Sequence, residues 1–479
     1  MTPNKSDEIF DDWKERQTLA EKMIPIVGQM YREAGVVIAV YGRRLKDGSK
    51  LDIIKAHKFA RQMVGAELDI AQSYEILKEL SKLKIAPARI DLGKMCYEYN
   101  QLDNGQSIAD YLKEKLSDII TDQPTNQAEP KDVVLYGFGR IGRLVARMLI
   151  DRSGDGYKMR LRAVVVRGKG GDIEKRASLL RRDSIHGPFS GSITVDEESN
   201  SIIANGNVIK LIYANSPDEI DYTQYGINNA LVVDNTGIWK DEAGLGLHLK
   251  SKGVEKVLLT APASGNIKNI VYGVNHTEIE PSDNILCAAS CTTNAIVPVL
   301  KVLNDEFGIR NGHLETVHSY TNDQNLIDNY HSAERRGRSA PLNMVLTSTG
   351  AAKAVAKALP ELTGILTGNA IRVPTPNVSM ALMSLNLNRE TTKEELNDFL
   401  LDKALNSSMQ SQIGYTSSTE LVSSDLVGSV NAGVVDSVAT IVDGDRVVLY
   451  VWYDNEAGYS SQVIRIMQDL AGMKLPDYP

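Results

Sequence analysis

The pattern of apolar and polar positions changes near residue 130. Upstream of it, apolar side chains recur with helical spacing at Ile70, Tyr74 and Leu77. A second amphipathic stretch begins at Ser107, with an acidic residue three positions later, which is typical of a capping box at a helix start. The pattern therefore predicts an all-α N-terminal domain over residues 1–125.

A polar segment separates this region from the rest. Residues 121–130, TDQPTNQAEP, contain two prolines and no large apolar side chain, the composition of an exposed linker. Directly afterwards, residues 133–136 form a short apolar run of the buried-strand type, which ends in glycines and passes into helical spacing. Strand-like runs at 163–166, 230–233 and 256–260 then alternate with polar or helical stretches, which favours parallel βαβ units in a doubly wound sheet.

The pattern changes again at residue 290. Longer strands and loops follow, with the clearest strands at 380–387 and 447–453. We therefore expect an α+β domain over 290–455, and a C-terminal helix over 456–479 that completes the doubly wound domain. No internal repeat is apparent.

A glycine-rich turn lies between the first strand and helix of the doubly wound domain. Gly137, Gly139 and Gly142 form GxGxxG, with Arg140 and Ile141 between the last two. The first glycine allows a tight turn, the second lets the backbone approach a pyrophosphate, and the third lets the helix pack closely. Because a helix N-terminus offers unpaired N–H groups, we expect the phosphates of a dinucleotide over 139–141. This predicts a Rossmann-type domain over 131–289, although a glycine turn without a ligand is the alternative.

The second strand of this domain ends in an unusual residue. An acidic side chain that binds the ribose 2′-hydroxyl is expected there, but the strand over 163–166 is followed by Arg167. A guanidinium cannot accept a hydrogen bond from a hydroxyl, whereas it can bind a 2′-phosphate. Arg167 therefore favours NADP as the cofactor, and use of NAD as well remains open. The alternative is that Arg167 is only a solvated cation in a loop.

Composition and charge narrow the function classes. Apolar residues make up 42% of the chain and charged residues 24%, which is ordinary for a globular protein. The formal net charge of −8 disfavours a nucleic-acid partner. No run approaches the roughly 18 apolar residues that a membrane span needs, and the first thirty residues lack the pattern of a secretory signal. We therefore expect a cytoplasmic protein with no membrane partner.

The cysteines and histidines point to one candidate nucleophile. The chain has three cysteines, too few for a disulfide framework, and its seven histidines show no ligand-like spacing, so we expect no metal. Cys291 lies in ASCTTN directly before an apolar helical pattern. A thiol at a helix N-terminus has a lowered pKa and is favoured as a thiolate nucleophile. His318, 27 residues later, is a candidate base, although a lone cysteine and a lone histidine form a weak signal. Cys287 resembles a small buried hydrophobe.

Five segments, in order along the chain, resemble the signature segments of phosphorylating glyceraldehyde-3-phosphate dehydrogenases. They are ASCTTN (289–294), HSYTNDQ (318–324), RRGR (335–338) leading to TSTGAAK (347–353), RVPTPNV (372–378) and WYDNE (452–456). The resemblance covers about residues 131–476 and does not extend to the first 130. It implies an NAD(P)-dependent oxidoreductase of glycolysis or gluconeogenesis that acts on an aldehyde and forms a homotetramer.

The resemblance also implies roles for individual residues. Cys291 would attack the aldehyde of glyceraldehyde 3-phosphate and His318 would act as acid and base. The resulting thioester would be cleaved by inorganic phosphate to 1,3-bisphosphoglycerate. The implied phosphate-binding residues are Thr321 and Arg372 for the substrate, Ser290, Thr292, Thr349 and Gly350 for the attacking phosphate, and Arg336 near both. The expected cofactor-binding residues are Gly137, Gly139, Arg140, Ile141, Gly142, Arg167, Thr260, Asn455 and Tyr459.

Two other functions compete with this one. An erythrose-4-phosphate dehydrogenase uses the same cysteine and histidine but releases an acid by hydrolysis. The small hydroxyl and glycine groups at 347–350 argue against it, because they suit the entry of phosphate. A regulatory binding protein on the same scaffold is the other alternative, and the retention of every expected catalytic group argues against that. The departures from the family are Arg167, Ala295 in place of a second cysteine, and a loosely similar segment at 215–221.

Overall fold

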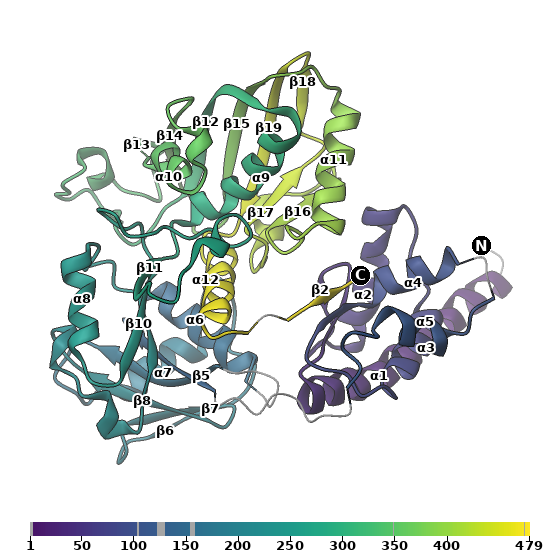
Figure 1. The fold of residues 1–479 in the computed structure, drawn as a ribbon, viewed down its shortest axis with the longest axis horizontal. Coiled ribbons are helices and arrows are strands. Elements are labelled where there is room, and N and C mark those ends of the chain that lie inside the picture. Colours follow the sequence, from purple (N-terminus) through teal and green to yellow (C-terminus); the bar gives the residue numbers. More distant parts are fainter. Residues whose placement is uncertain (1–2, 103–104, 122–129, 154–158, 348, 474) are drawn as a thin grey trace. The chain divides into compact units, whose positions relative to one another are not determined.

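The computed structural model describes residues 3–102, 105–121, 130–153, 159–347, 349–473 and 475–479. It divides into two compact units (Figure 1). The N-terminal unit contains residues up to Pro130 together with 473–479, and the second unit contains Lys131–Arg152 and Met159–Gly472. Most of the predicted linker, residues 122–129, lies outside the described residues.

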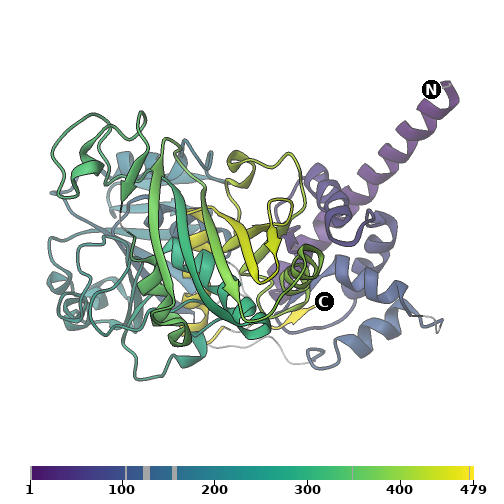
Figure 2. The same ribbon diagram turned by 90° about the horizontal axis from the view of Figure 1, so that it is seen from above.

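The N-terminal unit is mainly helical, as predicted. Its helices are α1 (Pro3–Ala34), α2 (Lys50–Val64), α3 (Ile70–Leu80), α4 (Leu92–Asn100) and α5 (Ile108–Lys115). The predicted start at Ser107 is confirmed, because the Ser107 side chain accepts a hydrogen bond from the Asp110 N–H at 3.2 Å. The first turns of α1 project beyond the other helices of this unit (Figure 2).

The prediction that this unit is all-α needs a correction. It also contains a four-stranded sheet in the order β2 (Arg43–Arg44), β1 (Val37–Val40), β3 (Arg89–Asp91) and β20 (Asp477–Tyr478). Strands of two to four residues are too short to give a recognisable alternation of apolar and polar positions. The strand β20 comes from the far end of the sequence and pairs in parallel with β3, with Asp477 opposite Arg89.

The first half of the second unit is a doubly wound sheet, which confirms the predicted Rossmann-type fold. In sheet order the strands are β11 (Ile285–Cys287), β10 (Val254–Leu259), β9 (Ala230–Asp234), β4 (Lys131–Tyr136), β5 (Met159–Val166), β8 (Asn207–Tyr213), β7 (Ser201–Ala204) and β6 (Ile193–Asp196). The pairs from β11 to β8 are parallel, and β8, β7 and β6 pair antiparallel. Its helices are α6 (Arg140–Asp151), α7 (Ile173–Arg181) and α8 (Glu242–Lys250).

The second half is an α+β fold around another eight-stranded sheet. Its strands run in the order β13 (Val345–Thr347), β14 (Leu366–Val373), β12 (Ile309–Ser319), β15 (Ser379–Leu387), β19 (Arg446–Tyr453), β17 (Gly433–Asp436) and β16 (Ile413–Thr416), and β18 (Ile441–Asp443) pairs with β19. The helices are α9 (Cys291–Phe307), α10 (Ala351–Ala358) and α11 (Lys393–Asn406). The apolar face of α9, including Ile296, Leu300 and Leu303, is fully buried in the core beside this sheet.

The last helix of the unit differs from its prediction. A helix was expected over 456–479, but α12 (Ala457–Leu470) ends at Leu470, and residues 477–478 form β20 instead. The residues of α12 from Ala457 to Gln468 are buried, and the helix packs against α6 and α9. The helix thus lies between the two sheets of the second unit. Among the described residues, no helix is both long and apolar enough to cross a membrane.

Candidate active site

Cys291 is the first residue of α9, as the sequence predicts. Ser290 caps this helix, since its hydroxyl accepts a hydrogen bond from the Thr293 N–H at 3.1 Å. The preceding residue, Ala289, has a left-handed backbone (φ 52°), and its carbonyl accepts a hydrogen bond from the Tyr459 hydroxyl at 3.0 Å. The chain therefore turns sharply into α9, and Cys291 is partly buried there against the core.

His318 lies close to Cys291 because of strand pairing. It is the penultimate residue of β12, which pairs in parallel with β14 so that His318 is opposite Arg372. The Cys291 Sγ and His318 Nε2 atoms are 3.6 Å apart. On the other side of the ring, Nδ1 lies 2.7 Å from the Ser319 carbonyl oxygen. Arg372 Nη1 is 2.9 Å from Nδ1 and donates to the same carbonyl at 2.9 Å. Because a carbonyl can only accept, the shorter contact at 2.7 Å assigns the hydrogen to Nδ1 and leaves Nε2 as an acceptor that faces the thiol. Cys291, His318 and Arg372 together are called the cysteine–histidine centre below.

The electrostatics of this centre keep the Cys291 thiol and the His318 imidazole neutral. Burial lowers the pKa of His318 to about 3, and the nearby positive charge of Arg372 acts in the same direction. Burial also raises the pKa of the Cys291 thiol above its ordinary value, although Arg372 and hydrogen bonds from Thr292 oppose that shift. The prediction of a lowered cysteine pKa is therefore wrong for the free protein, because the desolvation of the thiol outweighs the helix N-terminus.

Comparison with known proteins places this geometry in a family. Residues 131–242 match the model of the glyceraldehyde 3-phosphate dehydrogenase NAD binding domain, and residues 290–455 match that of the C-terminal domain. The chain belongs to the glyceraldehyde-3-phosphate dehydrogenase family. This membership identifies it as an NAD-dependent oxidoreductase that acts on an aldehyde group.

Curated relatives fall into two groups by coverage. A glyceraldehyde-3-phosphate dehydrogenase-like protein of Pseudomonas aeruginosa is 60% identical over 460 residues, which cover 95% of this chain and all of the relative. The glyceraldehyde-3-phosphate dehydrogenase of Zymomonas mobilis and glyceraldehyde-3-phosphate dehydrogenase 1 of Bacillus subtilis are each 40% identical over 341 residues, or 71% of this chain and 98% of each relative. A match of 460 residues must include part of the N-terminal unit, so this unit is shared with the Pseudomonas protein.

Three of the implied phosphate-binding residues come together in the structure. Arg372 Nη1 donates to the Ser319 carbonyl at 2.9 Å and lies 3.4 Å from the Thr321 hydroxyl. Arg336 donates to the Asp323 carboxylate at 2.7 Å, and the Thr321 hydroxyl donates to the same carboxylate. Arg372 Nε is buried without a hydrogen-bond partner among the described residues, so it remains able to bind an anion.

The sequence analysis missed the role of Asp323 in this arrangement. Burial alone would raise the pKa of Asp323, but the Thr321 hydroxyl and the charges of Arg336 and Arg372 lower it below its ordinary value. The carboxylate is therefore ionised and holds Thr321 and Arg336 in place. The position of Asp323 within the HSYTNDQ segment could have indicated this role from the sequence.

The residues assigned to the attacking phosphate are more dispersed. Ser290 caps α9, and the Thr292 hydroxyl is 2.9 Å from the Tyr453 hydroxyl. Thr349 accepts a hydrogen bond from the Ala351 N–H at 3.1 Å, directly before α10, and Gly350 precedes that helix. Among the described residues, no hydrogen bond joins Thr349 or Gly350 to the cysteine–histidine centre.

The glycine-rich turn has the shape that a dinucleotide requires. Gly137 has φ 95°, and a Cβ added there would lie 2.9 Å from Thr236 Cγ2. A Cβ at Gly142 would lie 2.4 Å from the Gly137 carbonyl oxygen. Gly139 precedes the first residue of α6, and the space around its α-carbon is open. The predicted strand, turn and helix are therefore confirmed, and the residues present fit a bound pyrophosphate.

Two predicted cofactor residues have side chains that serve the fold. Arg140 Nε donates to Glu456 at 2.8 Å and Nη1 to Asp183 at 2.5 Å, so its guanidinium joins α6 to the start of α12. Only the backbone of Arg140, with that of the half-buried Ile141, remains for phosphate binding. Tyr459 is buried, and its hydroxyl supports the turn before Cys291.

Asn455 is fixed in one orientation beside the histidine strand. Its Oδ1 accepts hydrogen bonds from the Ser319 hydroxyl at 2.7 Å and the Ser379 hydroxyl at 3.0 Å. The Nδ2 group is consequently the side of the amide that can donate to a ligand. Thr260 is nearly buried at the end of β10, where its hydroxyl lies 3.0 Å from Asn235 Oδ1 and 3.1 Å from the Asp234 carbonyl.

Arg167 lies at the carboxyl end of β5, as predicted, in surroundings that are open to solvent. Its guanidinium is 5.8 Å from the centre of the Trp239 ring. An acidic residue does lie in this corner, but the Asp172 carboxylate is paired with Arg176 at 2.8 Å and accepts a hydrogen bond from the Tyr213 hydroxyl at 2.7 Å. Arg176 also donates to the Arg167 carbonyl at 3.0 Å. Arg167, Asp172, Arg176 and Tyr213 are called the β5 corner below.

Proposed function

We propose that this protein is a phosphorylating glyceraldehyde-3-phosphate dehydrogenase. It would oxidise D-glyceraldehyde 3-phosphate with NAD or NADP and inorganic phosphate, reversibly, to 1,3-bisphosphoglycerate. The observation that carries the proposal is the 3.6 Å separation of Cys291 Sγ and His318 Nε2. Family membership supplies the reaction class, and this pair supplies a nucleophile beside a base.

The first step follows from the protonation states. Because the thiol and the imidazole are both neutral, His318 Nε2 removes the thiol proton while Sγ bonds to the aldehyde carbon. The imidazolium then gives its proton to the carbonyl oxygen, which forms a hemithioacetal. Arg372 disfavours the charged imidazolium, so the proton is released readily.

The oxidation step uses the same histidine. His318 Nε2 takes the hemithioacetal hydroxyl proton as the carbon loses a hydride, and a thioester on Cys291 remains. A nicotinamide cofactor supplies the acceptor for that hydride when it is bound. Asn455 would hold the carboxamide of the ring through Nδ2, because two serine hydroxyls already occupy its Oδ1. Inorganic phosphate then attacks the thioester carbon and Sγ leaves.

The anion-binding groups would divide between two phosphates. Thr321, Arg336 and Arg372 lie beside the cysteine–histidine centre and suit the phosphate that the substrate carries. Ser290, Thr292, Thr349 and Gly350 would serve the attacking phosphate, through hydroxyl and backbone groups near the starts of α9 and α10.

Cofactor choice is a separate part of the proposal. The exposed Arg167 could bind a 2′-phosphate, and the only carboxylate described in the β5 corner, Asp172, already has two partners. We infer that the protein uses NADP at least as well as NAD. By analogy with the family we also expect a homotetramer, which light scattering of the purified chain would test.

Steady-state kinetics on the full chain test the proposed function. Glyceraldehyde 3-phosphate and erythrose 4-phosphate would each be assayed with both cofactors, with and without inorganic phosphate. We expect turnover of glyceraldehyde 3-phosphate that depends on phosphate. Phosphate-independent oxidation of erythrose 4-phosphate would favour the hydrolytic relative. Inactivity of the protein with an intact, reduced Cys291 would favour a binding role.

A further inference from the structure

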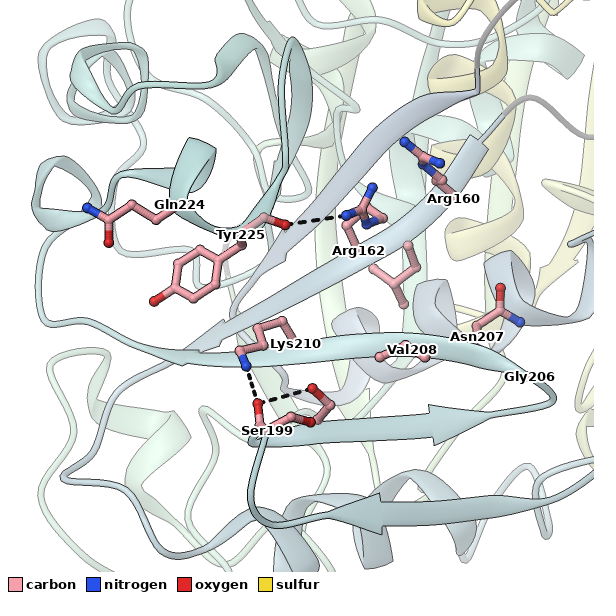
Figure 3. A pocket seen from close by; sticks show the side chains of 11 residues that line it. Arg160, Arg162, Ser199, Gly206, Asn207, Val208, Lys210, Gln224 and Tyr225 are labelled. Carbon is pink, nitrogen blue, oxygen red and sulfur yellow. Dashed lines mark hydrogen bonds between the residues drawn. The ribbon is translucent and has the colours of Figure 1, made fainter.

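A cavity of about 740 Å³ opens on the Rossmann sheet, away from the residues that the proposed reaction uses (Figure 3). Its lining comes from the start of β5, from β7 and β8, and from the short 3₁₀ helix Tyr222–Tyr225. The volume lies within the range of small-molecule sites, roughly 300 to 1,000 Å³. None of the residues assigned above to substrate or cofactor lines it.

The cavity is positively charged. Arg160, Arg162 and Lys210 line it, and none of the lining residues that the structure describes is acidic. Behind the two arginines, the buried carboxylate of Asp132 accepts from Arg160 Nε at 2.6 Å and from Arg162 Nη1 at 3.3 Å. One carboxylate therefore orients two guanidinium groups and compensates the charge of only one. At the other end, Lys210 Nζ donates to the Ser199 carbonyl. Hydrogen bonds from Ser199, and to a smaller extent the charge of Lys210, lower the pKa of Asp196.

A flat ring and an apolar side chain lie beside these cations. Tyr225 is 38% exposed, and Lys210 Nζ lies 6.0 Å from the centre of its ring. Val208 is 58% exposed on β8. In Figure 3, Tyr225 and Gln224 lie at one end of the cavity and Arg160 at the other, with Arg162 between them. An occupant that matches both ends needs a planar ring and, some distance from it, a negatively charged group.

We propose that this cavity binds a nucleoside triphosphate, with the base against Tyr225 and the phosphates extending from Lys210 past Arg162 toward Arg160. The site is distinct from the cofactor site. Arg160 begins β5 and Arg167 follows its end, and seven residues of strand span roughly 23 Å. A nucleic-acid strand is disfavoured, because the chain is acidic overall and the cations lie in one bounded cavity.

Calorimetric titration of ATP into the full chain tests the proposal. The protein would first be saturated with whichever of NAD and NADP has the lower KM, so that ATP cannot occupy the cofactor site. We expect one ATP per chain, and an unchanged affinity when the cofactor concentration is doubled. Adenosine and inorganic tripolyphosphate should each bind at least about tenfold more weakly than ATP. Adenosine lacks the phosphates that the cations would bind, and tripolyphosphate lacks the ring that would contact Tyr225.

Variants locate the binding. Lys210→Gln should weaken ATP binding about tenfold, the usual effect of losing one charged hydrogen bond, and Tyr225→Leu should weaken it severalfold. Lys393→Gln, on α11 in the other half of the unit, is the matched control and should leave the affinity unchanged. Thermal melting would verify that each variant is folded.

Several outcomes would overturn the proposal. These are the absence of ATP binding, equal affinity in wild type, Lys210→Gln and Tyr225→Leu, or tripolyphosphate that binds as tightly as ATP. An RNA octamer that binds more tightly than ATP and loses affinity in Lys210→Gln would show instead that the cavity belongs to a nucleic-acid surface.

Discussion

The cysteine–histidine centre and the β5 corner belong to the same unit but are held in different ways. In the first, His318 is buried, has a partner on each ring nitrogen, and lies on a strand paired along eight positions with β14. In the second, Arg167 is exposed on the loop after β5, and its guanidinium makes a cation–π contact with Trp239 at 5.8 Å.

The difference indicates where an amino-acid substitution should change activity strongly and where it should change it little. A group that must move protons over about 3 Å depends on the packing of every neighbour. A cation that selects between two cofactors acts through charge and can do so from a solvated loop. We therefore expect substitutions to have large effects at the centre and small effects at the corner.

Loss of the sulfur should have the largest effect. Cys291→Ala removes the atom that would hold the acyl group in the proposed reaction, so we expect kcat to fall by at least about 10⁴-fold, to the detection limit. Cys96→Ala, which removes a buried thiol in the N-terminal unit, is the matched control and should retain turnover. Appreciable activity in Cys291→Ala, measured as cofactor reduction, would refute the assigned nucleophile.

Loss of the base should have the next largest effect. His318→Asn keeps a polar group of similar size but cannot take a proton, so kcat should fall by about 10²- to 10⁴-fold. The Sγ atom is still present, and a single-turnover experiment should therefore still detect a slowly formed acyl-enzyme. A kcat within twofold of the wild-type value would contradict the role of His318.

The pKa shifts predict how the free thiol reacts with alkylating agents. Only the thiolate reacts, and burial raises the pKa of Cys291 above its ordinary value. The rate of alkylation by iodoacetamide should therefore rise about tenfold per pH unit, or about 10²-fold from pH 7 to pH 9. Mass spectrometry of the peptide that contains Cys291 measures this rate. A plateau below pH 8 would show that the thiol ionises far more easily than its burial implies.

A substitution of Arg372 tests the cause of the Cys291 pKa shift more directly. Its positive charge lowers the pKa of Cys291, so Arg372→Met should slow alkylation at pH 8 relative to the wild type. A faster rate would mean that the larger opening left by the missing side chain outweighs the lost charge.

The smallest effect is expected at the β5 corner. Arg167→Gln should raise the KM for NADP about tenfold, since it removes one charged partner of the 2′-phosphate, and change the KM for NAD little. Lys169→Gln in the same loop is the control. Equal changes in KM for both cofactors would show that Arg167 does not bind the 2′-phosphate.

Local chemistry made part of the structure predictable. The helix starts at Ser107, Arg140 and Cys291 follow from capping residues or glycines within a few positions, and the strands beside them are continuous apolar runs. Periodicity could not predict the pairing of His318 with Arg372, because the two residues are 54 positions apart. The resemblance to a known family implied a separate role for each residue, and the register of their strands is seen only in the structure.

The errors have a common physical origin in tertiary structure. The raised pKa of Cys291 results from desolvation by residues distant in the chain. The side chain of Arg140 donates to Glu456, 316 residues away, a contact that no local sequence pattern indicates. The short strands of the N-terminal unit form a sheet only because neighbouring strands supply their hydrogen bonds.

The pairing of β20 with β3 has a consequence for biosynthesis. The paired residues Arg89 and Asp477 are about 390 positions apart, a very long-range contact. The ribosome completes β3 long before residues 477–478 exist, so the N–H groups of Arg89 and Asp91, which finally bond to the carbonyls of Pro476 and Pro479, stay unpaired during most of translation. An unpaired strand edge can recruit strands of other chains. The nascent protein should therefore be most prone to aggregation in that interval, and variants truncated before Pro476 should retain this liability permanently.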